Sequence, residues 1–127
     1  MTTLTGGEVV LRCLAQEGVK HVIGITDEGY HTIQHHCREY GVRFLAPRHE
    51  AAGAHIAQGI YKSSGEVSAV LSGGGPGTAN VLAGVICARA EGVPMLVITA
   101  RRRKEVVYPS RIGVYQGADQ LDWFRPH

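Results

Sequence analysis

Glu50 is an acidic side chain at the start of a stretch of small residues, and it is the first candidate for proton transfer. Its neighbours are Pro47, Arg48 and His49 on one side and a run of small residues through Gly59 on the other. That pattern predicts a helix with the carboxylate in its first turn, where the positive end of the helix dipole favours an acid. Local signals alone therefore favour a helix-capping acid over a catalytic one.

Two adjacent acids, Asp27 and Glu28, follow the apolar run 21–25 and precede Gly29. Neighbouring carboxylates at the end of a strand can serve acid–base chemistry. A polar turn after a strand usually contains such residues in any case, so the pattern leaves both interpretations open.

A glycine-rich loop at positions 72–80 joins an apolar run to a predicted helix, which is the usual setting of a phosphate cradle. It fits neither common phosphate motif, because no Lys-Ser or Lys-Thr pair follows and Ala79 and Asn80 interrupt a G-x-G-x-x-G pattern. Pro76 also removes one backbone donor. We expect instead that the glycines let a flat group approach the backbone closely.

The seven histidines predict no metal site. His35 and His36 are adjacent, and His49 and His55 diverge around their helix, so neither pair converges on one ion. No Ser–His–Asp or Cys–His arrangement supports nucleophilic catalysis. The cysteines form no C-x-x-C pair, and we expect reduced, mostly buried thiols in a cytoplasmic protein. They are Cys13, Cys37 and Cys87.

The charge balance argues against nucleic acid as a partner, because the net charge is only +2. The basic run 101–104 has no aromatic residues among its members, which favours a solvated loop over an anion-binding patch. No apolar run approaches the roughly 20 residues that cross a bilayer, so no membrane partner is expected.

Predicted helices and apolar strands alternate along the 127 residues, a length that suits one domain. Thr5 and Glu8 fit a capping box for the first helix, which Gly18 ends. The expected strands are 21–25, 42–46, 67–71 and 94–99. The remaining expected helices are 30–40, 50–63, which Gly65 closes, and one from the glycine-rich loop to about 91; a short final segment runs through 123. Continuously apolar strands indicate a parallel sheet covered on both faces. The fold class is therefore α/β, a three-layer, doubly wound parallel sheet flanked by helices.

In such sheets, ligands bind in the loops beyond the carboxyl ends of the strands. Four loops qualify, at 26–29, 47–50, 72–78 and 100–116. The helix after Glu50 also has an unusually small face, which permits close packing on its own chain or on a second subunit, and the sequence favours neither. That face comprises Ala51, Ala52, Ala54, Ala57 and Gly59.

Five segments, in register over nearly the whole chain, resemble the N-terminal, pyrimidine-binding domain of thiamine diphosphate-dependent enzymes of the acetolactate synthase and 2-oxo acid decarboxylase group. Any one of them would be a weak signal, but five in the same order are specific. The segments are 5–8 together with 16–25, Arg48-His49-Glu50 through Tyr61, 72–80, 93–99 and Tyr115-Gln116-Gly117-Ala118-Asp119.

The resemblance implies that Glu50 hydrogen-bonds to N1′ of the cofactor's aminopyrimidine and favours its imino tautomer. That tautomer removes the proton from C2 of the thiazolium, and the resulting ylid attacks a 2-oxo acid such as pyruvate. Glu50 is then expected in an apolar, water-poor pocket where it can share a proton near neutral pH. Gln116 would approach the substrate, and the glycine-rich loop would lie near the pyrimidine through Gly74, Gly75, Pro76, Gly77 and Asn80.

Two positions depart from the family pattern. The family's glycine turn is replaced by Thr26, Asp27 and Glu28, which we expect to form a loop on the substrate side. Glu28 falls near an Asp that handles protons in the decarboxylases, so it is a third catalytic candidate; alternatively, the two acids make the pocket hostile to an acidic substrate. Ala51 stands where many acetolactate synthases have Gln.

The family binds the diphosphate and a magnesium ion through a separate C-terminal domain with a GDG motif, and this sequence has no GDG. We therefore expect residues 1–127 to be one domain, incomplete at its C-terminal end, and inactive without a diphosphate-binding domain or subunit. The active site would form at an interface in a homo- or hetero-oligomer. Two alternatives stay open: a subunit of a split 2-oxo acid decarboxylase, or a non-catalytic binding or regulatory module that kept the fold.

Overall fold

The computed structural model describes residues 3–103, 105, 114 and 116–127. Its centre is a four-stranded parallel sheet with the strand order β2-β1-β3-β4. The strands are β1 (His21–Gly24), β2 (Arg43–Leu45), β3 (Ala69–Ser72) and β4 (Leu96–Thr99). In register, Val22 pairs with both Phe44 and Ala69, and Val70 pairs with Val97.

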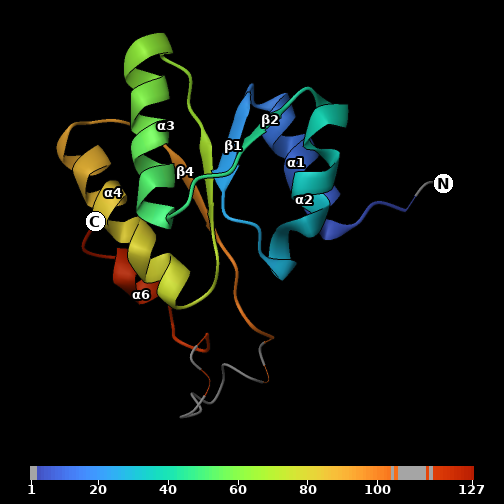
Figure 1. Ribbon diagram of the computed structural model, residues 1–127. Coiled ribbons are helices and arrows are strands. Elements are labelled where there is room, and N and C mark those ends of the chain that lie inside the picture. Colours follow the sequence, from blue (N-terminus) through green and yellow to red (C-terminus); the bar gives the residue numbers. More distant parts are fainter. Residues whose placement is uncertain (1–2, 104, 106–113, 115) are drawn as a thin grey trace.

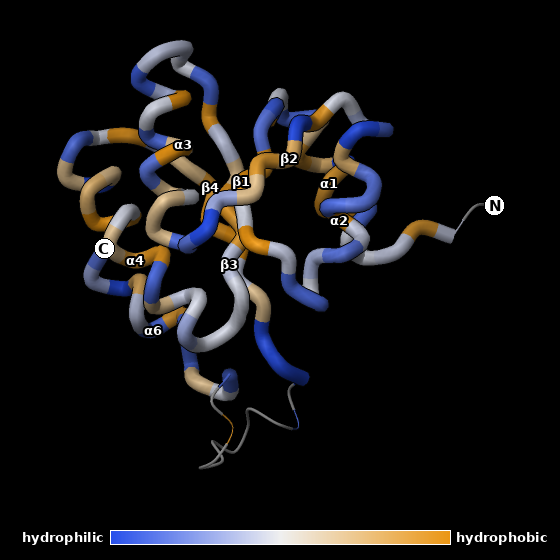
Figure 2. Tube along the Cα trace, in the orientation of Figure 1, coloured by the Kyte–Doolittle hydropathy of each residue, from blue (hydrophilic) through white to orange (hydrophobic). Residues whose placement is uncertain are grey.

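Helices cover both faces of the sheet (Figure 1), which confirms the predicted three-layer α/β architecture. One layer holds α1 (Gly6–Gln16), η1 (Glu28–Tyr30), α2 (His31–His36) and η2 (Cys37–Tyr40). The other holds α3 (Glu50–Ser64), α4 (Pro76–Ala90) and α6 (Leu121–Phe124). Figure 2 shows apolar residues concentrated along the strands and the helix faces that cover them.

The local signals at the helix ends act as the sequence predicts. Thr5 and Glu8 form a reciprocal capping box at the start of α1, and the hydrogen bond from the Thr5 backbone lowers the pKa of Glu8. Gly65 ends α3 in the left-handed conformation, with φ of 73°. That conformation costs a glycine little because it has no Cβ.

Two expectations need correction. The predicted helix 30–40 is one short α-helix between two 3-10 turns, consistent with its low-propensity residues such as Thr32, Ile33 and the histidines. The thiols are not mostly buried, because Cys13 and Cys87 lie on the solvent side of α1 and α4. Cys37 is buried, and burial raises the pKa of its thiol.

Candidate functional site at the carboxyl end of the sheet

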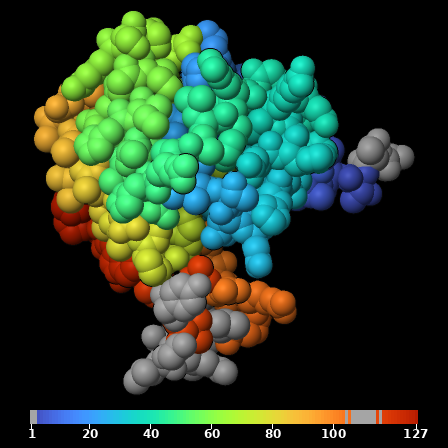
Figure 3. Space-filling view, viewed as in Figure 1, coloured from blue at the N-terminus to red at the C-terminus, as the bar shows by residue number. Residues whose placement is uncertain are grey.

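The chain reverses its winding between β1 and β3. The chain leaving β1 enters the α2 layer, whereas β3 leads to α4 on the opposite face, although the two strands are hydrogen-bonded neighbours. Ligands of open α/β sheets bind at such a switch point, beyond the carboxyl ends of the strands. Figure 3 shows the orange residues that follow β4 at this same lower end of the molecule.

A pocket of about 390 Å³ opens at this switch point. Acidic side chains from the loop after β1, basic side chains after β4 and the glycine-rich loop after β3 contribute to its wall. The lining residues are Asp27, Glu28, Gly29, Gly74, Ala100, Arg101, Arg102 and Gln116. The structure therefore brings Glu28, Gly74 and Gln116 together, whereas the exposed Thr26 is not among the lining residues.

Asp27 points toward the glycine-rich loop. Its Oδ1 accepts a hydrogen bond of 2.9 Å from the backbone N–H of Gly29 and caps η1. Its Oδ2 lies so close to Gly73 that a Cβ at that position would be 2.9 Å away. Glu28 is exposed at the start of η1. Asp27 thus contacts the glycine-rich loop, whereas Glu28 is the more exposed acid of the pair, and both line the pocket.

Three glycines of the loop lie close against other atoms of the same chain. Besides the Asp27 contact at Gly73, a Cβ on Gly74 would lie 3.0 Å from the carbonyl oxygen of Ala100. A Cβ on Gly77 would lie 3.0 Å from Glu50 Oε1. The expected close approach of a flat group stays a prediction, while these intramolecular contacts leave little room for a side chain at three of the positions.

Glu50 does not cap its helix. It is the first residue of α3, and the N-cap is His49, whose Nδ1 accepts the Ala51 N–H at 3.3 Å. The carboxylate instead reaches α4, where Asn80 Nδ2 donates to Glu50 Oε2 at 3.0 Å. Among the described residues this is its only hydrogen bond, so Oε1 stays available above Gly77.

Glu50 is partly exposed. The water-poor surroundings expected for it are therefore not supplied by the described residues of this chain.

Sequence reasoning missed Gln120, which is 3% exposed. Its Oε1 accepts the Gly75 N–H at 2.6 Å and is also hydrogen-bonded by the Thr78 hydroxyl, while its Nε2 donates to the Ala100 carbonyl at 2.8 Å. The only sequence signal was a polar residue beside the segment 115–119. That segment drew attention to Gln116 instead, and Tyr115 lies outside the described residues.

Tyr30 was also missed. Its buried hydroxyl lies 2.6 Å from the Ser72 carbonyl and 3.0 Å from the Ile98 carbonyl, at the ends of β3 and β4. Burial, together with the nearby Asp27 charge, raises the pKa of this phenol well above its usual range. Tyr30 therefore serves as a neutral hydrogen-bond donor that ties the α2 layer to the strands beneath the pocket.

The predicted residues of the glycine-rich loop occupy distinct positions. Gly75 has φ of 66° and ψ of −110° and precedes α4 as its N-cap. Pro76 is the exposed first residue of α4, where a missing N–H costs nothing. Gly77 and Asn80 adjoin Glu50 on the following turn.

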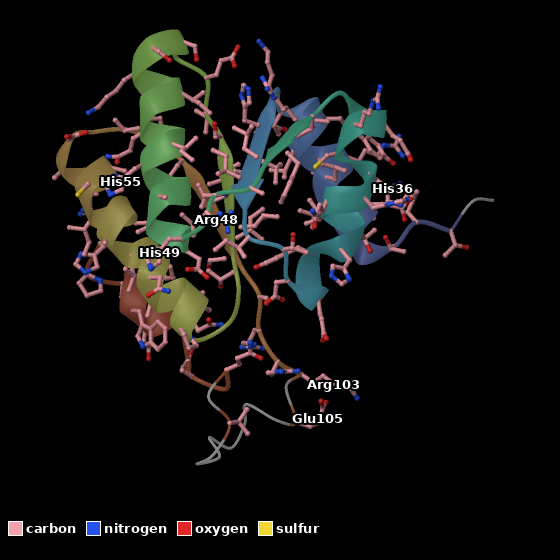
Figure 4. All side chains as sticks on the ribbon, in the orientation of Figure 1. His36, Arg48, His49, His55, Arg103 and Glu105 are labelled. Atoms are coloured by element: carbon pink, nitrogen blue, oxygen red, sulfur yellow. The ribbon has the colours of Figure 1, made fainter. Side chains whose placement is uncertain are left out.

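Within the described part of the chain, no group of three or more His, Cys, Asp or Glu side chains is arranged to hold a metal ion. Figure 4 shows His49 and His55 along α3 and His36 on the opposite layer. His36 contacts Glu39 at 3.0 Å, and that hydrogen bond raises the pKa of the imidazole. None of the described helices is both long and apolar enough to cross a membrane.

The family model "Thiamine pyrophosphate enzyme, N-terminal TPP binding domain" matches residues 4–123. The chain therefore belongs to this family of thiamine diphosphate-dependent enzymes, and it is the family's N-terminal domain.

Its similar relatives are acetolactate synthases. The chain is 33% identical to the acetolactate synthase isozyme 3 large subunit of Escherichia coli, over 99% of this chain and 22% of the relative. It is 32% identical to the acetolactate synthase large subunit of Haemophilus influenzae, again over 99% of this chain and 22% of the relative. The chain thus spans 22% of the length of these relatives, so it corresponds to one part of a larger multidomain enzyme.

The described residues fit one end of thiamine diphosphate. A carboxylate with an available oxygen, Glu50, stands beside the glycine-rich loop, where Gly77 adjoins that oxygen. No metal cluster occurs among the described residues, and the glycine-rich loop lacks a phosphate motif. The donor set therefore suits an aminopyrimidine better than a metal-bound diphosphate.

Proposed function

We propose that this chain is the pyrimidine-binding half-site of a lyase or synthase that acts on a 2-oxo acid such as pyruvate, as acetolactate synthases do. The single observation that carries the proposal is the meeting of Glu50 with Gly77 and Asn80 at the carboxyl end of the sheet. Thiamine diphosphate, when bound, supplies the electron sink for cleaving and forming bonds at a 2-oxo carbon.

Glu50 holds and shares a proton with the ring nitrogen of the aminopyrimidine in this proposal. Asn80 donates a hydrogen bond to Oε2 of Glu50 and fixes the plane of the carboxylate. Oε1 is therefore the oxygen that makes the hydrogen bond to the ring nitrogen. Gly77 lies against that oxygen, where a Cβ would be 3.0 Å away and would press on the carboxylate. A carboxylate held on one side and available on the other is suited to proton sharing.

The pocket at the switch point receives the substrate. Gln116 offers an amide that can donate to or accept from a 2-oxo acid, and Arg101 and Arg102 bring positive charge to the same wall. Glu28, on the acidic side, is a candidate for moving a proton to or from the product.

The other half of the site belongs to a diphosphate-binding domain, which binds the diphosphate and magnesium. That domain, in the same protein or in a partner subunit, would cover the partly exposed Glu50 and exclude water from it. An active site at such an interface implies an oligomer or a multidomain chain, consistent with relatives of which this chain covers 22%.

The decisive experiment is Glu50→Gln in the intact protein together with its diphosphate-binding domain. The amide keeps the shape but cannot share a proton, so we expect exchange of the cofactor's C2 proton, followed by NMR in D₂O, to slow by about 100-fold or more. Turnover of pyruvate should fall in parallel, while the unfolding midpoint stays close to that of the unsubstituted protein.

Glu8→Gln is the matched control, because Glu8 is also an acid in the first turn of a helix but lies in the opposite layer. It should leave C2 exchange unchanged. An exchange rate in Glu50→Gln equal to that of the unsubstituted protein would falsify the assignment of Glu50.

A further inference from the structure

Gln120 joins three parts of the site through one buried amide group. Its oxygen faces the glycine-rich loop, where it is hydrogen-bonded by the Gly75 N–H and the Thr78 hydroxyl. Its nitrogen donates to the carbonyl of Ala100, just after β4. At 3% exposure, these contacts are shielded from water, so none of them is readily replaced by solvent.

The loop that Gln120 holds cannot fix its own shape. Gly75 has φ of 66°, a conformation that glycine enters freely and therefore leaves freely, and it caps α4 without a side-chain hydrogen bond. Thr78 reaches back to the Gly73 carbonyl at 3.0 Å, but its hydroxyl has only one proton to donate. The Gln120 oxygen is the acceptor that fixes both Gly75 and Thr78 from outside the loop.

The same side chain sets the spacing of the pocket walls. Ala100 and Gly74 both line the pocket, and a Cβ on Gly74 would lie 3.0 Å from the Ala100 oxygen that Gln120 also binds. Gln116, four residues before Gln120, lines the pocket too, and its Cβ would lie 3.7 Å from a Cβ on Gly74. One amide thus fixes the glycine-rich loop, the end of β4 and the Gln116 segment relative to one another.

The position of α4 follows from the same contacts. Thr78 lies between Gly77 and Asn80, the two residues that meet Glu50. A loop that shifted at Gly75 would move the start of α4 and with it the donor that orients Glu50.

We infer that Gln120 is a positioning residue for the cofactor's pyrimidine end, acting through the glycine-rich loop and not by touching the cofactor. The inference rests on the proposed function. It requires a side chain with both a donor and an acceptor at this position, because the Ala100 carbonyl and the Gly75 N–H must be satisfied together.

The test measures thiamine diphosphate affinity of the intact protein, with magnesium present, by isothermal titration calorimetry. Gln120→Met keeps the side-chain size but leaves the Gly75 N–H and the Ala100 carbonyl without their partner. We expect affinity to fall by about tenfold or more, the consequence of losing two buried hydrogen bonds that order the loop.

Gln58→Met is the matched control. Gln58 is also a buried glutamine, 6% exposed, and it hydrogen-bonds His55 within α3 and Glu91 at the end of α4 that is remote from the glycine-rich loop. Its replacement should lower the unfolding midpoint without changing cofactor affinity by more than about twofold.

Gln120→Glu supplies a second, independent readout. A protonated carboxyl group can accept from Gly75 with one oxygen and donate to Ala100 with the other, whereas the ionised form places a negative oxygen against that carbonyl. The thiamine diphosphate affinity of Gln120→Glu, divided by that of the unsubstituted protein, should therefore be higher at roughly pH 5.5 than at roughly pH 8. This variant also decides the question if Gln120→Met does not fold.

Three outcomes contradict the inference. Unchanged affinity in Gln120→Met, or equal losses of affinity in Gln120→Met and Gln58→Met, would show a purely structural role. If the affinity of Gln120→Glu relative to that of the unsubstituted protein were the same at both pH values, the donor to Ala100 would be unimportant. Failure of the unsubstituted protein to bind thiamine diphosphate is a separate result, which overturns the proposed function and this inference with it.

Discussion

The two helical layers bury the sheet in different ways. The α1/α2 layer packs large side chains against one face, among them Leu11, Tyr30 and Ile33. The α3/α4 layer packs small ones, and Ala54 approaches Gly84 so closely that a Cβ on the glycine would lie 2.4 Å from the Ala54 Cβ. Large side chains keep helices apart, whereas small residues let their backbones approach.

That difference explains why the candidate site is built on one layer. Because α3 and α4 lie close together, their first turns bring Glu50 within 3.0 Å of Asn80. On the other layer, the corresponding acid of α1, Glu8, caps its own helix and lies 3.9 Å from His36 near the surface. The small-residue face of α3 is thus used within the chain at Ala54 and Ala57, while Ala52 and Gly59 stay exposed.

The largest effect on stability is expected in the α1/α2 layer. Leu11 is fully buried there, and Leu11→Ala should lower the free energy of unfolding by about 2–5 kcal/mol through lost burial and a residual cavity. Val10→Ala, at a neighbouring position that is 37% exposed, should change it by about 0.5 kcal/mol or less. Urea denaturation measures both, and equal effects would contradict a close-packed core on this side.

Substitutions at two glycines of the α3/α4 layer should change the free energy of unfolding by smaller amounts and in opposite directions. Gly84→Ala should destabilise by about 1–3 kcal/mol, because the new methyl group forces α3 and α4 apart. Gly59→Ala meets nothing within 4 Å and should stabilise by about 0.5–1 kcal/mol. Separating the helices should also weaken the Glu50–Asn80 contact, so Gly84→Ala alone should reduce cofactor affinity.

Urea denaturation gives the two stabilities, and calorimetry of the intact protein gives the affinity. If Gly84→Ala were as stable as Gly59→Ala, the close contact between α3 and α4 would not be required, and the contrast between the two layers would disappear.

The smallest effect on stability is expected at Tyr30, whose hydroxyl links the α2 layer to the strands below the pocket. Because burial raises the pKa of its phenol, the unfolded chain loses this proton first as pH rises. The stabilisation is therefore complete below the usual tyrosine pKa of about 10 and is lost above it. Tyr30→Phe should cost about 1 kcal/mol at neutral pH but show a shallower loss of stability between roughly pH 9.5 and 11.

Thermal unfolding across that range measures the difference, and Tyr61→Phe, on the partly exposed face of α3, is the control. A parallel decline of Tyr30→Phe and the unsubstituted protein would mean that the phenol does not contribute to the alkaline transition.

Much of the fold could be predicted because it depends on local patterns. The capping box at Thr5, the glycine that ends α3 and the alternation of apolar strands with helices all appear in short windows of sequence. The helix 30–40 was predicted less well, since weak propensities let tertiary packing divide it. Exposure of Cys13 and Cys87 was missed because a position within a helix does not reveal which face is covered.

The sequence proposed members for the candidate site but could not give their contacts. Glu50, Gln116 and the glycine-rich loop were found by resemblance to a family, and the sequence placed them after different strands. Gln120 and Tyr30 were not found, because the residues they contact are distant along the chain. Gly75 lies 45 positions from Gln120, and Ser72 and Ile98 lie 42 and 68 positions from Tyr30.

By itself, the sequence determined the α/β class, the order of its elements and the loops where chemistry can occur, because periodicity and caps act over a few residues. Only the tertiary structure decided that Glu50 faces Asn80 instead of capping α3, that Asp27 contacts the glycine-rich loop, and that Gln120 hydrogen-bonds to that loop. Each of these depends on the close packing of segments far apart in the chain, which sets a side chain's partner and is not recorded in any local pattern.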